Sequence, residues 1–107
     1  MTGFSDREKA KEGKYAHDQE LEFKIVARRN KLLGLWAAEL MGKSEEEAAA
    51  YGKEVVIADL EEAGEEDVFR KLRGDLDAAG VECSDHQIRK HMESLMETAR
   101  KQVMNEV

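Results

Sequence analysis

The chain has 107 residues, enough for one small domain, and its 41% hydrophobic and 38% charged residues describe a soluble protein that still buries a core. The absence of proline, the abundance of Ala, Leu, Glu and Lys, and a single cysteine, Cys83, favour helices and exclude an internal disulfide or a multi-cysteine zinc site. The net charge of −7, with eleven Asp or Glu and two Lys in residues 39–67, argues against a nucleic-acid partner and an anionic membrane surface, and no apolar run approaches the roughly 20 residues of a membrane helix.

The first predicted helix runs from about Ser5 to Met41, and its C-terminal half is strongly apolar. Leucine, isoleucine, valine and tryptophan side chains recur there at helical spacing. Because Leu32–Met41 contains one charged residue, Glu39, we expect this stretch to be the most buried helix, with Trp36 as a core anchor. Gly34 lies inside the helix at a cost in helix propensity, which predicts that a neighbouring helix approaches closely there.

The N-terminal half of the same segment has no continuous apolar stripe. A helix over residues 5–41 would span ~55 Å at ~1.5 Å per residue, so its N-terminal end has nothing in its own domain to pack against. We therefore expect residues 1 to about 18 to be frayed or disordered in the free protein. Phe4 and Tyr15 are eleven residues apart, or three helical turns, so they share one face when the segment is helical and suit a partner's groove. The alternative is a disordered tail with incidental aromatic residues.

Three further helices are predicted over residues 45–63, 66–79 and 85–105. Two capping boxes, Ser44–Glu47 and Ser84–Gln87, mark helix starts, and Cys83 and Ile88 are placed as a hydrophobic staple around the second. Three glycines follow apolar segments and suit the left-handed position after a helix; these are Gly42, Gly64 and Gly80. Because the loops are short, we expect an all-α fold, a four-helix bundle over residues 21–107 with a flexible N-terminal segment over residues 1–20.

Motifs for catalysis or metal binding are not evident. His86 and His91 are five residues apart, which turns them ~140° away from each other, whereas zinc-binding pairs on a helix are four apart. The sequence has neither a glycine-rich phosphate loop after a strand nor a serine in a strand-to-helix elbow. We therefore expect a protein that is not an enzyme and has no metal or cofactor, while weak ATP or ADP binding between helices near Trp36 stays open.

One block of the sequence resembles a known family. The stretch Arg28–Gly42, RRNKLLGLWAAELMG, is similar to the hallmark of the zeta-type F1-ATPase inhibitor family of alphaproteobacteria. Three other blocks agree in order along the chain, namely Phe4–Ala10, Glu66–Leu72 with Gly64 before it, and Ser84–Lys90. The resemblance implies a four-helix bundle whose N-terminal segment enters a catalytic interface between the α and β subunits of F1, next to γ, becomes helical there and blocks ATP hydrolysis.

The resemblance also implies which residues act. Carried over by position, the inhibitory, partner-binding residues are Phe4, Asp6, Arg7, Glu8, Lys9, Ala10, Lys14, Tyr15, Ala16 and His17. The implied partners are the α, β and γ subunits of F1, and the chain is expected to be a monomer when free. It is expected to be cytoplasmic and, when bound to F1, peripheral at the inner face of the plasma membrane. Two other functions remain open, a small helical nucleotide sensor and a helical adaptor unrelated to F1.

Overall fold

The computed structural model describes the backbone of residues 2–61 and 65–106, and the side chains of residues 18–60 and 65–106. This part of the chain forms four helices, α1 (Thr2–Leu40), α2 (Glu45–Glu61), α3 (Glu66–Ala78) and α4 (Asp85–Glu106), and no strand. The predicted all-α, four-helix fold is therefore confirmed. None of the described helices is both long enough and apolar enough to cross a membrane.

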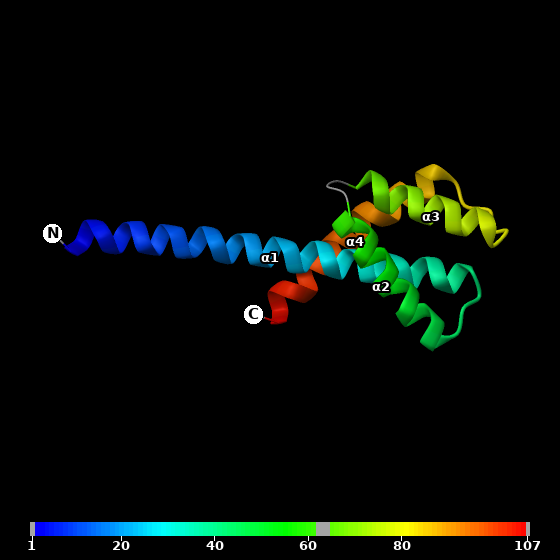
Figure 1. The fold of residues 1–107 in the computed structure, drawn as a ribbon, viewed down its shortest axis with the longest axis horizontal. Helices are drawn as coiled ribbons and strands as arrows, with labels where there is room; N and C mark the ends of the chain where they lie inside the picture. Colours follow the sequence, from blue (N-terminus) through cyan, green and yellow to red (C-terminus); the bar gives the residue numbers. More distant parts are fainter. Residues whose placement is uncertain (1, 62–64, 107) are drawn as a thin grey trace.

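Helix α1 is the axis of the molecule (Figure 1). Its C-terminal half packs mainly against α2 and α4. Helix α3 packs less extensively against each of the other three helices. The N-terminal half of α1 continues in the same direction past the ends of the other helices, and the molecule measures 66 × 24 × 21 Å. Because the backbone of residues 2–17 continues α1 while their side chains lie outside the described residues, the expectation of a frayed free segment stays a prediction.

The helix starts are built by the two predicted capping boxes. The Ser44 Oγ accepts from the Glu47 backbone N–H at 3.2 Å, and Glu47 Oε1 accepts from the Ser44 N–H at 3.2 Å. The same reciprocal pair joins Ser84 and Gln87, at 3.1 Å and 2.9 Å. Each box satisfies two backbone N–H groups that have no partner inside the helix, which fixes where α2 and α4 begin.

The ends of α1 and α3 are set by glycine, also as predicted. Gly42 has a φ of +72° and Gly80 a φ of +73°, both in the left-handed region. The next residue in each case closes the helix end, Lys43 N–H to Ala38 C=O at 3.0 Å and Val81 N–H to Leu76 C=O at 2.9 Å. The third predicted stop, Gly64, lies outside the described residues.

The core consists of two hydrophobic clusters. The larger one joins all four helices and contains Leu33, Ala37, Ala38, Tyr51, Val55, Val68, Leu72, Leu76, Ile88 and Met92. The smaller one joins α1 to the second half of α4 through Ile25, Ala99 and Val103. The apolar stripes of α3 and α4 face inward and consist of Val68, Leu72 and Leu76 on α3 and Ile88, Met92, Ala99 and Val103 on α4. The predicted burial of the C-terminal half of α1 holds for Leu33 and Ala37, whereas Leu40 is 43% exposed and Trp36 is half-buried at the edge of the core.

Helices α1 and α2 cross at two glycines. An ideal Cβ on Gly34 would lie 2.6 Å from the Gly52 Cα, and one on Gly52 would lie 3.3 Å from the Lys31 carbonyl oxygen. The backbones are therefore so close that a methyl group does not fit between them. This contact confirms the close helix approach that Gly34 predicts.

Two polar side chains of α1 are buried, which the helical pattern did not predict. Arg29 is 1% exposed and Asn30 is fully buried. The Arg29 Nε donates to Asn30 Oδ1 at 2.7 Å, and the Arg29 Nη1 pairs with Glu65 Oε1 at 3.2 Å. Arg29 thus links α1 to the residue just before α3, and its charge is balanced by a carboxylate at the surface.

Candidate partner-binding surface

The ten residues that the family resemblance assigns to inhibition all belong to the N-terminal end of α1. Their side chains lie outside the described residues, so the contacts expected of Phe4, Asp6, Arg7, Glu8, Lys9, Ala10, Lys14, Tyr15, Ala16 and His17 stay predictions. The backbone places them in sequence on one helix that leads directly into the bundle. The described surface nearest to them is the root of α1, where this helix meets α2 and α4.

The root of α1 is where packing against the bundle begins. The side chains of Asp18, Gln19 and Glu20 are exposed, and the next residue, Leu21, packs against the cluster of Ile25, Ala99 and Val103. Within the described residues, α1 is therefore solvated before Leu21 and packs against the hydrophobic core from Leu21 on.

Ion pairs fasten the end of α4 to this root. Arg28 Nη2 lies 2.8 Å from a Glu106 carboxylate oxygen, and its Nη1 donates to Gln102 Oε1 at 2.9 Å. Arg100 pairs with Glu22 at 3.1 Å. These side chains are partly exposed, so each pair stabilises the fold by less than about 1 kcal/mol. They join the second half of α4 to α1.

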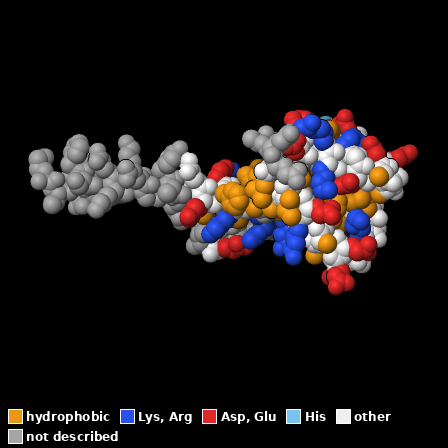
Figure 2. All heavy atoms as spheres, viewed as in Figure 1, with side chains coloured by type: hydrophobic (Ala, Val, Ile, Leu, Met, Phe, Trp, Pro, Cys, Tyr) orange, Lys and Arg blue, Asp and Glu red, His pale blue; other side chains and the backbone are white. Residues whose placement is uncertain are grey.

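An apolar patch lies at the same root, on the face seen in Figure 2. Phe23 on α1 is 61% exposed, and Ile57 and Leu60 on α2 are 55% and 62% exposed. A groove of about 320 Å³ runs between α1, α2 and α4, with Phe23, Ala27, Val56 and Val103 among its lining residues. Large apolar side chains that remain exposed next to a groove are typical of surfaces that bind another macromolecule.

Basic side chains border this groove. Lys24, Arg28 and Lys31 line it together with one acidic residue, Glu106, which is already paired with Arg28. Within the described part of the chain, neither Lys24 nor Lys31 has an ion-pair partner. The groove therefore carries an excess of positive charge on a protein whose net charge is −7.

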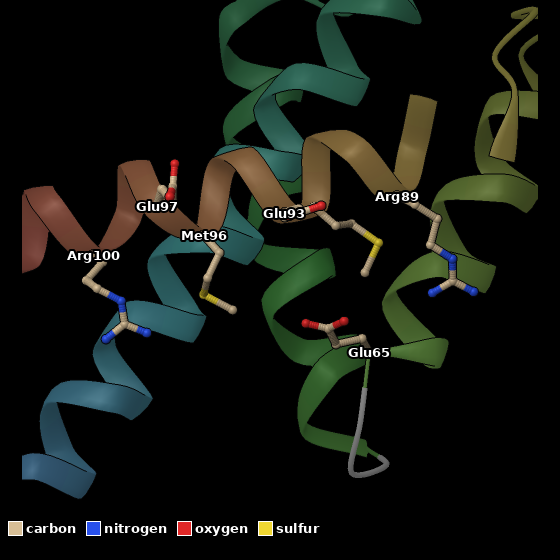
Figure 3. A pocket seen from close by; sticks show the side chains of 7 residues that line it. Glu65, Arg89, Glu93, Met96, Glu97 and Arg100 are labelled. Atoms are coloured by element: carbon tan, nitrogen blue, oxygen red, sulfur yellow. The ribbon is translucent and has the colours of Figure 1, made fainter. Parts of the chain in front are cut away.

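A second, larger hollow lies along α4 (Figure 3). It has a volume of about 570 Å³, and Met92 and Met96 contribute its apolar part, with Glu65, Glu93 and Glu97 around them. The arginines toward its two ends, Arg89 and Arg100, are already paired with Glu66 and Glu22, at 2.9 Å and 3.1 Å. The carboxylates outnumber the arginines in this hollow, so it has no excess positive charge to bind a phosphate group.

The rings of Trp36 and His91 pack against each other, with Trp36 at the edge of the larger core cluster. Trp36 stacks on His91 with ring centroids 4.0 Å apart and an angle of 15° between the planes. One face of the Trp36 indole, which the nucleotide-sensor alternative would use for a base, is therefore covered by the imidazole. No group of His, Cys, Asp or Glu among the described residues is arranged to hold a metal ion.

The phenol of Tyr51 has a raised pKa and belongs to a structural contact. Burial raises the pKa of Tyr51 far above its ordinary value of 10, and the hydrogen bond from its Oη to Asp75 Oδ2, 2.7 Å long, adds to this. Lys71 lies 5.2 Å from the Tyr51 ring centroid and pairs with Asp75 at 3.1 Å. This group fastens α3 to α2, and it lies in the larger core cluster rather than at the root of α1.

The sequence pattern did not single out Phe23, Ile57 or Leu60. Each lies off the apolar face of its own helix, since Phe23 is two residues from both Leu21 and Ile25, and Ile57 and Leu60 are one and two residues from Ala58 on α2, steps that turn a helix by ~100° and ~200°. An apolar residue on the polar face of an amphipathic helix is the signal that indicates such a surface.

Comparisons with known proteins agree with the resemblance in the sequence. The family model described as ATPase inhibitor subunit zeta matches residues 1–102. A structure solved by solution NMR is 53% identical to this chain, covers 81% of it and 99% of its own chain, and superposes with a TM-score of 0.72. The comparison with curated proteins gives no match. Because the family model spans nearly all of the sequence, the chain belongs to the ATPase inhibitor subunit zeta family.

Proposed function

We propose that this chain inhibits ATP hydrolysis by the F1 sector of a bacterial ATP synthase, through insertion of its N-terminal segment at a catalytic interface between the α and β subunits, next to γ. Family membership supports the general role, inhibition of an ATPase. The observation that carries the finer proposal is the form of α1, one helix that extends beyond the bundle on a molecule 66 Å long and 24 Å wide. In this account the chain is not an enzyme, needs no cofactor and is held at the inner face of the plasma membrane by F1.

The contacts at the root of α1 support different roles for the two halves of the helix: the C-terminal half packs in the bundle, and the N-terminal half binds the partner. Packing begins at Leu21, and the ion pairs of Glu22 and Arg28 with α4 hold the helix from there on. A helix without tertiary contacts is marginal in water, so a partner's groove is what stabilises the N-terminal half. The bundle then acts as a support that presents this half to F1.

The charges of the segment suit an interface lined by both signs. Arg7, Lys9 and Lys14 can pair with acidic groups of the partner, and Asp6 and Glu8 with arginines. Ordering the segment on insertion costs part of the interaction free energy, so the affinity for a given contact area is lower than for a preformed helix.

The direct test measures ATP hydrolysis by cognate F1 with added protein. We expect the full chain to inhibit, a peptide of residues 1–20 to inhibit more weakly, and a chain without residues 1–20 to be inactive. Because no described contact of the bundle involves residues 18–20, the shortened chain should keep its helical circular dichroism spectrum and cooperative melting. Full inhibition by the folded, shortened chain would contradict the proposal.

A matched pair of charge reversals separates a specific role of the segment from a general charge effect. Arg7→Glu with Lys9→Glu changes the charge of the segment by −4, and Lys90→Glu with Lys101→Glu makes the same change on the exposed surface of α4. We expect the first variant to lose inhibition by tenfold or more and the second to keep it. Equal losses in both variants would mean that net charge, rather than the inserted segment, governs inhibition.

A further inference from the structure

We propose that the root of α1 carries a second docking surface, the foot surface, formed by Phe23, Leu60, Lys24 and Lys31 around the groove between α1 and α2. Its occupant is an acidic amphipathic helix on the outside of the same α/β pair that receives the N-terminal segment. The inference rests on the proposed function and goes beyond it, because it adds a contact made by the folded bundle.

The apolar part of the foot surface is continuous across two helices. Phe23 of α1 and Val56 of α2 line the same groove, and Leu60 lies one helical turn beyond Val56 on the same face of α2. The side chains of Phe23 and Leu60 are each more than half exposed, although Ile25, two residues from Phe23 on α1, is buried. The two side chains can therefore pack against a partner without any change in the fold.

The charged part of the foot surface selects the kind of partner. Lys24 and Lys31 lie at the groove without ion-pair partners in the described part of the chain, whereas Arg28 between them is engaged by Glu106 and Gln102. Unpaired lysines beside an apolar groove favour a partner with carboxylates around an apolar stripe. A groove between two helices accepts a third helix through residues at i and i+4 or i+3 spacing.

Position along α1 indicates where this partner lies. Phe23 is six residues, or ~9 Å of helix, from the C-terminal end of the inhibitory segment at His17. A segment buried in a partner up to His17 brings Phe23 to the rim of that partner. Because the segment already tethers the bundle there, the foot surface needs little intrinsic affinity to raise the affinity of the whole chain.

The hollow along α4 is a weaker candidate for this role. Its arginines are already paired, and acidic residues dominate its rim. A second copy of this chain is a poorer occupant than F1, because the copy also carries an overall charge of −7 and presents the same lysines at the same surface.

The test compares the full chain with the peptide of residues 1–20, which lacks the foot surface. Phe23→Ala with Leu60→Ser should weaken inhibition by the full chain by about tenfold, toward the potency of the peptide. Met104→Ser is the matched control, because Met104 is also about half exposed, lies on α4 and does not line the groove. Unchanged melting temperature of each variant verifies that the fold is intact.

Charge and crosslinking complete the test. Lys24→Glu with Lys31→Glu should weaken inhibition and reduce its dependence on ionic strength, whereas Lys90→Glu with Lys101→Glu should not. A photoreactive phenylalanine at position 60 should crosslink to an α or β subunit within the inhibited complex.

The outcomes distinguish failure of the inference from failure of the proposed function. Full potency of the Phe23→Ala, Leu60→Ser chain, with the peptide still inhibitory, would overturn the foot surface and leave insertion standing. Crosslinking to a second copy, with a dimer in sedimentation velocity that the same substitutions abolish, would overturn it in favour of self-association. Absence of inhibition by both the unmodified chain and the peptide would instead refute the proposed function.

Discussion

Replacing Gly34 by alanine tests how closely α1 and α2 approach. The new Cβ would lie 2.6 Å from the Gly52 Cα, about 1 Å closer than ordinary carbon–carbon contact. Because the obstacle is helix backbone, it cannot rotate away as a side chain does, and the two helices must separate. Overpacking costs typically ~1–3 kcal/mol, and a clash with backbone lies at the upper end, ~3 kcal/mol, of which the ~1 kcal/mol that alanine gains over glycine in a helix offsets a part. We expect Gly34→Ala to lower the free energy of unfolding by about 2 kcal/mol.

The assay is urea and thermal unfolding followed by circular dichroism. A loss of about 2 kcal/mol corresponds to a fall in melting temperature of roughly 8–16 °C for a domain of this size. The matched control is Gly74→Ala in α3, where the new Cβ would meet nothing within 4 Å, so that variant should gain ~0.5–1 kcal/mol. Stabilisation by both substitutions would refute the close backbone contact as the reason for Gly34.

Two further predictions concern polar contacts that fix the helices. Arg29→Ala should lower the free energy of unfolding in urea by about 3 kcal/mol, because it removes a buried side chain and leaves Asn30 Oδ1 without its donor. The control Arg70→Ala, at the exposed surface, should change the free energy of unfolding little. The backbone N–H of Ser44 holds the pKa of Glu47 below its ordinary value of 4.5, so the stability from this carboxylate is present above the unfolded-state pKa and is lost as the pH falls through the folded-state pKa. An NMR titration should place the Glu47 midpoint below 4.5, and Ser44→Ala, which removes the hydroxyl but keeps the backbone N–H, should leave most of this lowering in place; a midpoint at or above 4.5 in the unmodified protein would exclude the Ser44 N–H as its cause.

The helix boundaries were predictable because their causes are local. A capping box needs a serine and a Glu or Gln three residues later, and a helix stop needs one glycine with a positive φ. Both signals are complete within a few residues of sequence, so the starts of α2 and α4 and the ends of α1 and α3 agree with the prediction to within about one residue.

The buried polar pair and the exposed apolar residues were not predictable because they depend on how helices cross. A helical pattern gives the face of a helix that is buried but not the length over which a neighbour covers it. Arg29 is buried and pairs with Glu65 just before α3, whereas Phe23 lies at the groove beside α2 and stays 61% exposed. The residues assigned to inhibition came from the family resemblance, and their side chains lie outside the described residues.

The continuity of α1 has a consequence for any change in its length. One continuous helix carries both the buried core positions and the N-terminal end, so an insertion between them rotates one relative to the other. One residue inserted at positions 18–20 would turn the preceding part of α1 by ~100° about the helix axis and move it ~1.5 Å away from the bundle. The backbone positions of the N-terminal residues would then lie at a different azimuth relative to the bundle, although no amino acid in either part had been replaced. Four inserted residues would nearly restore the azimuth and lengthen the helix by ~6 Å. The rotation of the N-terminal segment about the helix axis and its distance from the bundle can therefore be varied separately.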